Sequence, residues 1–272
     1  MRFVTFDIGM GAQAGRLDGD HVVPLTAPGE GDLGTLLRAG ALGEGHSGAP
    51  VALGDVRLLP PVPAPGKLIC IGLNYHAHAA EAGLDAPERP TFFAKFANAL
   101  VPDGATVALP PYSRRVDYEA EVAFVVGTTA KDVSEDRALD HIAGYTLLND
   151  LSARDYQMKT PQWMPGKVFD GSAPCGPALV TPDEVGAPDA IEIALTLNGE
   201  EMQRGTTADL VHSIPALMAH LSMLMTLEPG DIVSTGTPAG VGSTRDPKVW
   251  LKAGDELVID SPQLGRLATT LA

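Results

Sequence analysis

Acidic residues stand at alternate positions in the stretch 116–127, VDYEAEVAFVVG, as Asp117, Glu119 and Glu121. Alternation is typical of a β-strand, on which side chains two apart point to the same side, about 7 Å from one another. At an effective dielectric constant of about 20, each neighbouring pair of ionised carboxylates costs about 2 kcal/mol. The stretch continues as an apolar run typical of a covered strand, so solvent is not expected to relieve this repulsion. Either one acid is protonated, or basic side chains pair with the acids, or a divalent cation is bound.

Two of these explanations stay open on the sequence alone. Arg114 and Arg115 precede the stretch directly, so ion pairing accounts for the acids as well as a metal does. Asp150 ends a strand-like segment, where it could complete an oxygen-rich site or cap the helix-like segment that follows. With Glu119 and Glu121 it would give three carboxylates, and hard oxygen ligands of this kind suit Mg²⁺ or Mn²⁺ rather than Zn²⁺.

The elements that must position these acids are mostly short strands. Four prolines fall within residues 60–65, and such a run fits neither a sheet nor a helix interior. We therefore predict a small β-rich N-terminal domain, 1–62, with a hairpin turn at 18–20, and a larger domain, 63–272. Strands are expected at 67–72, 91–96, 116–127, 143–150 and, as an Asn-Gly hairpin, 191–203; helices are expected at 74–83, 134–142 and 213–225.

Composition narrows the class of partner. The 272 residues carry 19 basic and 34 acidic side chains, a net charge of −15, which argues against nucleic acid or an anionic membrane as partner. Cys70 and Cys175 lie in apolar stretches and are expected to be free, buried thiols. The beginning of the chain lacks a signal region, and no apolar run approaches the about 20 residues of a membrane span. We expect a cytoplasmic location.

Several segments in a fixed order resemble the fumarylacetoacetate hydrolase family. They are 69–83, ICIGLNYHAHAAEAG; 116–127; 146–157, TLLNDLSARDYQ; 165–177, PGKVFDGSAPCGP; and 231–242, DIVSTGTPAGVG. The resemblance covers about residues 64–272, and the N-terminal unit is similar to the hairpin domain of many bacterial members. It implies a strand-rich α+β fold, a mixed β-sandwich roll around a metal, and a homodimer.

The resemblance also implies a role for each acid of the stretch. Glu119, Glu121 and Asp150 match the ligands of the family's Mg²⁺ or Mn²⁺ ion. Asp117 is then a supporting acid, paired with a nearby arginine. The upstream carboxylate that the fumarylacetoacetate-cleaving enzyme adds to this set has no recognisable counterpart here, so that enzyme's own substrate does not carry over.

Candidate catalytic groups come from two further segments. His78 and Glu81 are three apart and share a helix face, where a carboxylate can fix the tautomer of a histidine and raise its basicity. That spacing describes a solvated pair equally well, but the resemblance implies a general base on a lid that orders over the substrate. It likewise identifies Lys167 as an active-site lysine, which would stabilise a carboxylate or enolate oxygen. Lys95 is a weaker candidate, because it could simply cover a strand.

Substrate-binding residues are assigned from the resemblance. Arg154 and Gln157 are also three apart, and without that context they would indicate an exposed helix face. Thr237 lies in the glycine-rich segment STGTPAGVG, which could equally be a tight turn and which lacks the lysine and spacing of a P-loop. In the family, the corresponding side chains lie at the substrate.

The function that follows is a metal-dependent hydrolase that cleaves a C–C bond in a small 2,4-dioxo acid of the acylpyruvate type. His78 would deprotonate a water that attacks the distal carbonyl, and the leaving group would be a pyruvate enolate. Decarboxylation of an oxaloacetate-type β-keto acid and isomerisation of a dienol diacid are the alternatives on the same site. A metal-binding or interaction protein without catalysis is the rival from another class.

Overall fold

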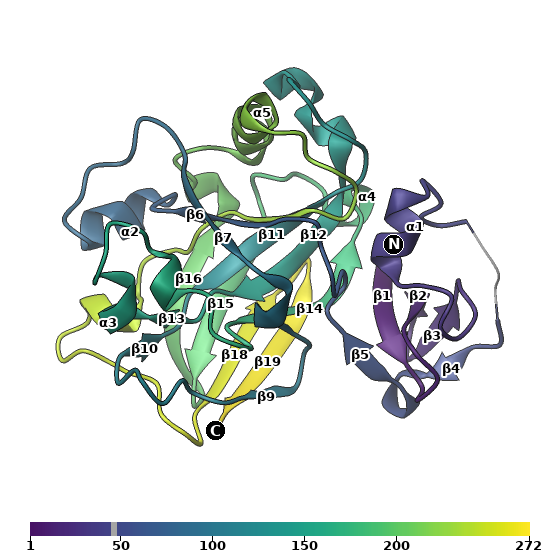
Figure 1. The fold of residues 1–272 in the computed structure, drawn as a ribbon, viewed down its shortest axis with the longest axis horizontal. Coiled ribbons are helices and arrows are strands. Elements are labelled where there is room, and N and C mark those ends of the chain that lie inside the picture. Colours follow the sequence, from purple (N-terminus) through teal and green to yellow (C-terminus); the bar gives the residue numbers. More distant parts are fainter. Residues whose placement is uncertain (45–47) are drawn as a thin grey trace.

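The structure is a computed structural model that describes residues 1–44 and 48–272. Within them the largest sheet has twelve strands and runs from β4 at one edge to β7 at the other (Figure 1). In spatial order its strands are β4 (Val51–Ala52), β3 (His21–Pro24), β2 (Gln13–Asp18), β1 (Arg2–Asp7), β14 (Ala173–Val180), β12 (Ile142–Asn149), β11 (Ala120–Val126), β17 (Ile232–Ser234), β6 (Leu68–Gly72) and β7 (Thr91–Lys95), with β5 (Arg57–Leu59) on β1 and β8 (Leu100–Val101) on β14.

A second sheet faces the first and encloses the main core with it. Its order is β16 (Glu200–Thr206), β15 (Glu192–Leu197), β18 (Glu256–Ser261), β19 (Gly265–Leu271) and β9 (Ala105–Val107). One hydrophobic cluster contains Phe124 of β11 together with Leu195, Ile259 and Leu267 of the second sheet. Parallel pairs such as β17–β6 occur among antiparallel ones. The predicted strand-rich α+β fold with a mixed sandwich is confirmed.

The N-terminal strands join the same large sheet. β1 pairs antiparallel with β14, Phe3 opposite Leu179, so the sheet continues across the predicted boundary. The hairpin at 18–20 is confirmed, because β2 and β3 pair with Asp18 opposite His21. Figure 1 shows this unit at one side of the molecule, with α1 (Leu33–Arg38) beside it. The division into domains 1–62 and 63–272 stays a prediction.

Helices are few and short. They are α2 (His76–Glu81), α3 (Arg154–Gln157), α4 (Pro182–Val185) and α5 (Ile214–Leu224), with 3₁₀ turns η1 (Leu53–Asp55), η2 (Ala97–Ala99), η3 (Glu135–His141), η4 (Met164–Gly166), η5 (Thr207–Asp209) and η6 (Gly242–Thr244). The helix expected at 213–225 is confirmed as α5, and the one expected at 134–142 is the 3₁₀ helix η3. In the described ranges no helix has both the length and the apolar character that a membrane span needs. Both cysteines are free and buried, as expected.

Candidate active site

The single strand expected at 116–127 is interrupted, and this changes the geometry of its acids. β10 (Val116–Asp117) pairs with β13 (Ser152–Ala153) in a small separate sheet, and β11 begins only at Ala120. Asp117 accepts hydrogen bonds from the backbone amides of Tyr118 at 2.9 Å and Gly242 at 2.7 Å. These bonds hold Asp117 to the glycine-rich segment. The expectation of one strand that carries all three acids on one face is therefore wrong, because Asp117 lies on β10 and only Glu121 lies on β11.

Three carboxylates from neighbouring segments nevertheless meet. Glu121 lies on β11, Glu119 directly before it, and Asp150 directly after β12, which pairs with β11. The Asp150 amide donates to the Glu119 carbonyl oxygen at 2.9 Å. All three side chains are buried, and one oxygen from each lies within 4.8 Å of the others. Their donor set, buried carboxylate oxygens alone, fits a hard divalent ion such as Mg²⁺ or Mn²⁺.

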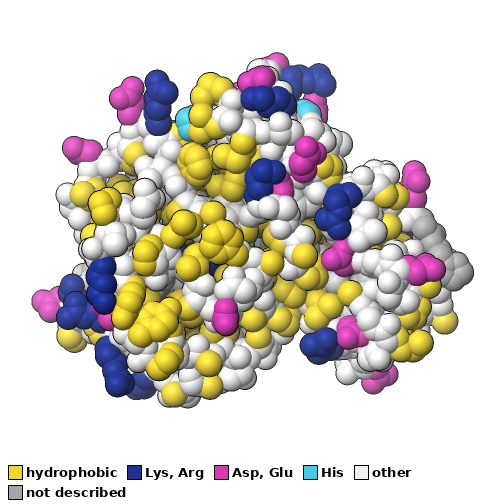
Figure 2. Space-filling view, viewed as in Figure 1, with side chains coloured by type: hydrophobic (Ala, Val, Ile, Leu, Met, Phe, Trp, Pro, Cys, Tyr) yellow, Lys and Arg dark blue, Asp and Glu magenta, His cyan; other side chains and the backbone are white. Residues whose placement is uncertain are grey.

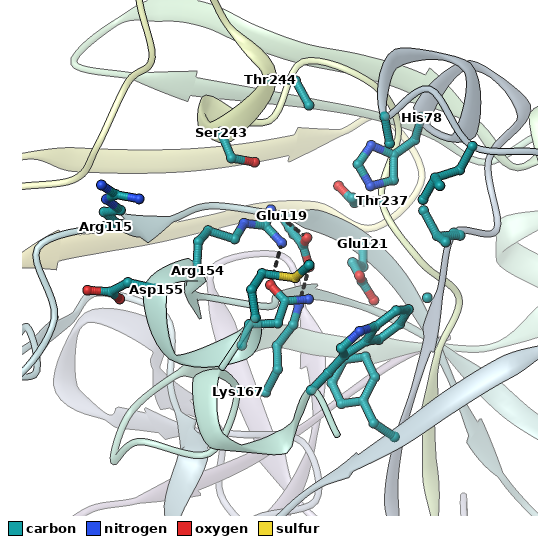
Figure 3. Close-up of a pocket in the computed structure, with 18 of the residues that line it drawn as sticks. His78, Arg115, Glu119, Glu121, Arg154, Asp155, Lys167, Thr237, Ser243 and Thr244 are labelled. Carbon is teal, nitrogen blue, oxygen red and sulfur yellow. Dashed lines mark hydrogen bonds and ion pairs between the residues drawn. The ribbon is translucent and has the colours of Figure 1, made fainter. Parts of the chain in front are cut away.

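Basic side chains compensate these acids, but they are not the arginines next to them in sequence. Lys167 Nζ donates to Glu119 Oε2 at 2.6 Å and to Asp150 Oδ2 at 2.8 Å. Arg154 contacts Glu119 Oε1 at 2.7 Å and donates from Nε to Asp117 Oδ2 at 2.9 Å. The predicted pairing of Asp117 with an arginine is thus present in the structure, with Arg154 as the partner. Figure 3 shows Arg154 and Lys167 pointing toward Glu119.

Lys95 completes the cluster from the opposite side. Its Nζ donates to Asp150 Oδ1 at 2.6 Å, and its side chain is buried. From the sequence Lys95 was only a weaker candidate, and its contact with Asp150 was not predicted. The signal that could have found it is a lysine at the end of an apolar strand, because a buried ammonium requires an acidic partner.

The two glutamates differ in their ionisation. Burial, then the charges of Asp150 and Glu119, raise the pKa of Glu121 well above its ordinary value. Burial acts in the same direction on Glu119, but Arg154 and Lys167 outweigh it and hold the pKa of Glu119 well below the ordinary range. Glu121 accepts from the Ser234 hydroxyl and from the Gly236 amide at 3.2 Å, both uncharged groups. A protonated acid was one of the three explanations for the alternating carboxylates, and Glu121 is the acid whose pKa is raised.

His78 stands over this cluster on α2. Its Nδ1 lies 3.4 Å from Glu81 Oε2, and the His78 side chain is mostly buried. Glu81 in turn accepts from the Gly240 amide, which is 3.1 Å from each carboxylate oxygen. A Cβ at Gly240 would lie 2.1 Å from the Met202 carbonyl oxygen, and its φ of +106° favours glycine. The glycine-rich segment therefore fixes the carboxylate that orients His78.

The remaining predicted residues line the same cavity. Gln157 Oε1 accepts from Arg154 Nη1 at 3.0 Å, and Thr237 Oγ1 accepts from Gln203 Nε2 at 2.7 Å. The cavity has a volume of about 560 Å³, in the range of small-molecule sites. Seven of the nine predicted site residues line it, namely His78, Glu119, Glu121, Arg154, Gln157, Lys167 and Thr237. Glu81 and Asp150 do not line the cavity, but each is bonded to a residue that does, Glu81 to His78 and Asp150 to Lys167.

Sequence reasoning missed several lining residues. Trp163 packs edge-to-face on Phe93, with ring centroids 6.0 Å apart, and Lys167 Nζ lies 5.0 Å from the centre of the Phe93 ring. Arg115 and Lys248 also line the cavity. Such residues come from loops and strand ends that carry no recognisable motif, so only the fold brings them together.

A buried carboxylate triad opposite a carboxylate-held histidine, on a strand-rich sandwich, defines a metal-dependent enzyme of small-molecule chemistry. The family model described as fumarylacetoacetate (FAA) hydrolase C-terminal matches residues 67–272. The chain belongs to the fumarylacetoacetate hydrolase family, whose members are enzymes, as predicted.

Similar proteins include enzymes of several activities. Oxaloacetate tautomerase fahd2, mitochondrial, from Xenopus laevis is 44% identical over 216 residues, which are 79% of this chain and 68% of the relative. The 2-hydroxyhepta-2,4-diene-1,7-dioate isomerase structure from Mycobacterium marinum is 31% identical, with a TM-score of 0.83, covering 100% of this chain and 98% of that one. The maleylpyruvate hydrolase from Sphingobium sp. SYK-6, in complex with manganese (II) ion and pyruvate, is 31% identical, with a TM-score of 0.81 and coverage of 100% and 99%.

Proposed function

We propose that the enzyme binds a small 2-oxo acid with the help of Mg²⁺ or Mn²⁺ and moves a proton at carbon 3, next to the 2-oxo group. Keto–enol interconversion of an oxaloacetate-type acid is the simplest such reaction. The observation that carries the proposal is the position of His78, held by Glu81, in the same cavity as Glu119 and Glu121. A base and an acidic metal site that share one cavity are what enolisation of a chelating substrate needs.

Glu119, Glu121 and Asp150 would hold the ion. When bound, it supplies Lewis acidity that polarises the 2-oxo group and stabilises negative charge on its oxygen. The Lys167 ammonium, already 2.6 Å from Glu119, lies where it can share in stabilising that charge. We assign the substrate carboxylate to Gln157 and Thr237, with Arg154 holding Glu119 and Asp117 in place.

His78 would act as the base. With Nδ1–H turned toward Glu81, the free Nε2 has its lone pair available and can take a proton from carbon 3 of the substrate. The electron pair of that C–H bond passes to the 2-oxo oxygen and gives the enolate. Return of the same proton from the imidazolium to this oxygen gives the enol, so no water or other reagent is consumed. The similarity to an oxaloacetate tautomerase supports this reading.

Hydrolysis of an acylpyruvate is the second candidate, and the His78–Glu81 pair favours it too. Here His78 would take a proton from water, whose oxygen adds to the distal carbonyl. The C–C bond then breaks, its electron pair goes to carbon 3, and the resulting pyruvate enolate takes up a proton. Likeness to a maleylpyruvate hydrolase supports this candidate. Decarboxylation of a β-keto acid would pass through the same enolate.

The test measures enolisation and hydrolysis side by side. Purified protein with Mg²⁺ is assayed for loss of the enol absorbance of oxaloacetate and for cleavage of acylpyruvates, with and without EDTA. We expect His78→Asn to lower the rate about 10²–10⁴-fold. The exposed His76, two residues away, gives the matched control His76→Asn, which should keep full activity. Absence of turnover with every 2-oxo acid would refute the proposal and favour a non-catalytic metal-binding protein.

A further inference from the structure

A buried glutamine outside the cavity lining, Gln203 on β16, joins two parts of the site. It is 2% exposed, and both the oxygen and the nitrogen of its amide have partners. Its Oε1 accepts from the backbone amide of Ala120 at 2.9 Å. Its Nε2 donates to Thr237 Oγ1 at 2.7 Å and to the Pro238 carbonyl oxygen at 2.9 Å. The proposed proton transfer does not use this side chain.

The two backbone partners determine which way round the amide lies. The Ala120 N–H can only donate, so it must face the amide oxygen. The Pro238 carbonyl oxygen can only accept, so it must face the amide nitrogen. In the opposite orientation two donors would meet at Ala120 and two acceptors at Pro238, and each buried group would be left unpaired. The group that faces Thr237 is therefore an N–H.

This orientation fixes the role of the Thr237 hydroxyl. A hydroxyl has one proton and two lone pairs, and a lone pair of Thr237 Oγ1 accepts from Gln203. In the described part of the chain no other residue accepts a hydrogen bond from Thr237. Thr237 lines the cavity with His78 and Glu121 (Figure 3), so its proton is available to a ligand there.

The same amide sets the position of Thr237 relative to the carboxylate triad. Ala120, the residue that donates to it, begins β11 and lies between Glu119 and Glu121. On the other side β16 lies close to the glycine-rich segment, since a Cβ at Gly205 would be only 2.6 Å from the proline that follows Thr237. One buried side chain thus links the hydroxyl to the strand of the proposed metal ligands.

We propose that Gln203 is a positioning residue, which holds the Thr237 hydroxyl as a hydrogen-bond donor toward the anionic end of the substrate. The inference rests on the proposed function, because it takes a 2-oxo acid to bind in this cavity. A hydroxyl that donates strengthens the binding of a carboxylate, whereas one that presents only lone pairs repels it. Gln203 does not line the cavity, so it acts on the ligand through Thr237.

Binding of oxalate, a dianion that the proposed reaction does not convert, tests this assignment. Its affinity for the Mn²⁺-loaded protein is measured by calorimetry, together with the affinity for Mn²⁺ itself. We expect Thr237→Val to weaken oxalate binding about 10–100-fold, because a charge-assisted hydrogen bond is lost, and Thr237→Ser to weaken it less than about threefold. Gln203→Met should weaken it about 3–10-fold, because the hydroxyl is then no longer held with its proton toward the cavity.

The double variant Gln203→Met/Thr237→Val distinguishes positioning from a structural role. If Gln203 acts through the hydroxyl, the double variant loses no more oxalate affinity than Thr237→Val alone, and every variant keeps its affinity for Mn²⁺. Gln13→Met, the same change at an equally buried glutamine of the N-terminal unit, is the matched control and should bind both ligands normally.

Gln203→Glu is the second variant, for the case that Gln203→Met does not fold. Its side chain keeps the shape of glutamine and can still accept from Ala120, but its other oxygen accepts from the Thr237 hydroxyl and turns that proton away from the cavity. Oxalate binding should then fall as far as in Thr237→Val.

Losses that add in the double variant, or a weaker affinity for Mn²⁺ in Gln203→Met, would overturn the inference. Unchanged oxalate binding in Thr237→Val or in Gln203→Glu would do so as well. Absence of oxalate binding by the unaltered protein would refute the proposed function and, with it, this inference. Because binding is measured without turnover, the expected losses in a protein that enolises nothing would refute only the proposed function.

Discussion

Replacement of Lys167 by methionine should destabilise the protein strongly without metal and only weakly with it. In the structure Lys167 Nζ lies between Glu119 and Asp150, at 2.6 and 2.8 Å. The lysine side chain is almost fully buried, so no solvent replaces it when it is removed. Methionine keeps most of the side-chain volume, and the change therefore isolates the charge.

The size of the effect follows from the groups that remain. Removing one partner of a buried ion pair costs about 3–5 kcal/mol, because it leaves an uncompensated charge. Glu119 retains Arg154, and Asp150 retains Lys95, so we expect the lower end, about 3 kcal/mol. For a chain of this size that lowers Tm by roughly 6–12 °C. A divalent ion would supply positive charge to the same carboxylates, and at about 100 times its Kd it stabilises the unaltered protein by about 2.7 kcal/mol.

Thermal unfolding in EDTA and in saturating Mn²⁺ measures both quantities. We expect the Tm difference between Lys167→Met and the unaltered protein to shrink by at least half in Mn²⁺. Lys252→Met, an exposed lysine outside the cavity, should show no difference in either buffer. A loss of the same size with and without Mn²⁺ would mean that the ion does not bind these carboxylates, and no loss in EDTA would refute the electrostatic account of the cluster.

Four further predictions concern metal binding, the stability of the metal-free protein, the carboxylate of Glu81 and the oligomer. Burial and neighbouring carboxylates raise the pKa of Glu121, so Mg²⁺ must displace a proton when it binds. The affinity of the protein for Mg²⁺ should therefore increase up to about tenfold per pH unit below that pKa. Calorimetry at several pH values checks this, and Glu121→Gln should remove the dependence of affinity on pH. The metal-free protein should also lose stability as pH rises from the ordinary carboxyl range toward the raised pKa, because the folded state then keeps a proton that the unfolded state has lost. Gly240→Ala should lower kcat by at least tenfold, because it displaces the Glu81 carboxylate that the Gly240 amide binds. Gly254→Ala, at φ +89° with nothing within 4 Å of the added Cβ, should cost only about 1 kcal/mol in denaturant unfolding and no activity. The expected homodimer should give twice the 28.3 kDa chain mass in light scattering. Figure 2 shows hydrophobic side chains gathered where Figure 1 places the edge strand β7, and Phe96, directly after β7, is 53% exposed. We therefore expect Phe96→Asp to give a monomer, whereas Met10→Asp, in the N-terminal unit, should leave the dimer intact.

The acids of the site could be found from the sequence because each lies at a strand end or next to one. The strand periodicity indicated Glu119 and Glu121, and the end of the next predicted strand indicated Asp150. β11 and β12 are antiparallel neighbours with Ala120 opposite Asn149, so the end of β12 lies beside the start of β11. Local patterns were therefore sufficient for the triad, and the family resemblance supplied the order of the remaining segments.

The partners of these acids could not be found in the same way. Glu119 and Lys167 are 48 positions apart, and Asp150 and Lys95 are 55 apart. Proximity in sequence favoured Arg114 and Arg115 instead, although neither pairs with the acids in the structure. Likewise, the break between β10 and β11 depends on the amide of Gly242, 125 positions away from Asp117. No local pattern contains such information.

The charges of the cluster indicate whether the metal ion is needed for folding or for catalysis. Asp117, Glu119, Glu121 and Asp150 give four carboxyl groups, and Lys95, Arg154 and Lys167 give three basic partners. With Glu121 protonated, as its raised pKa indicates, the cluster is neutral without any metal. Folding therefore does not need the ion: EDTA should abolish activity and leave the protein folded, with stability lower only by the lost ion binding, about 2.7 kcal/mol relative to ion at 100 times its Kd. A structural metal site would behave in the opposite way, because its carboxylates would be uncompensated once the ion is removed.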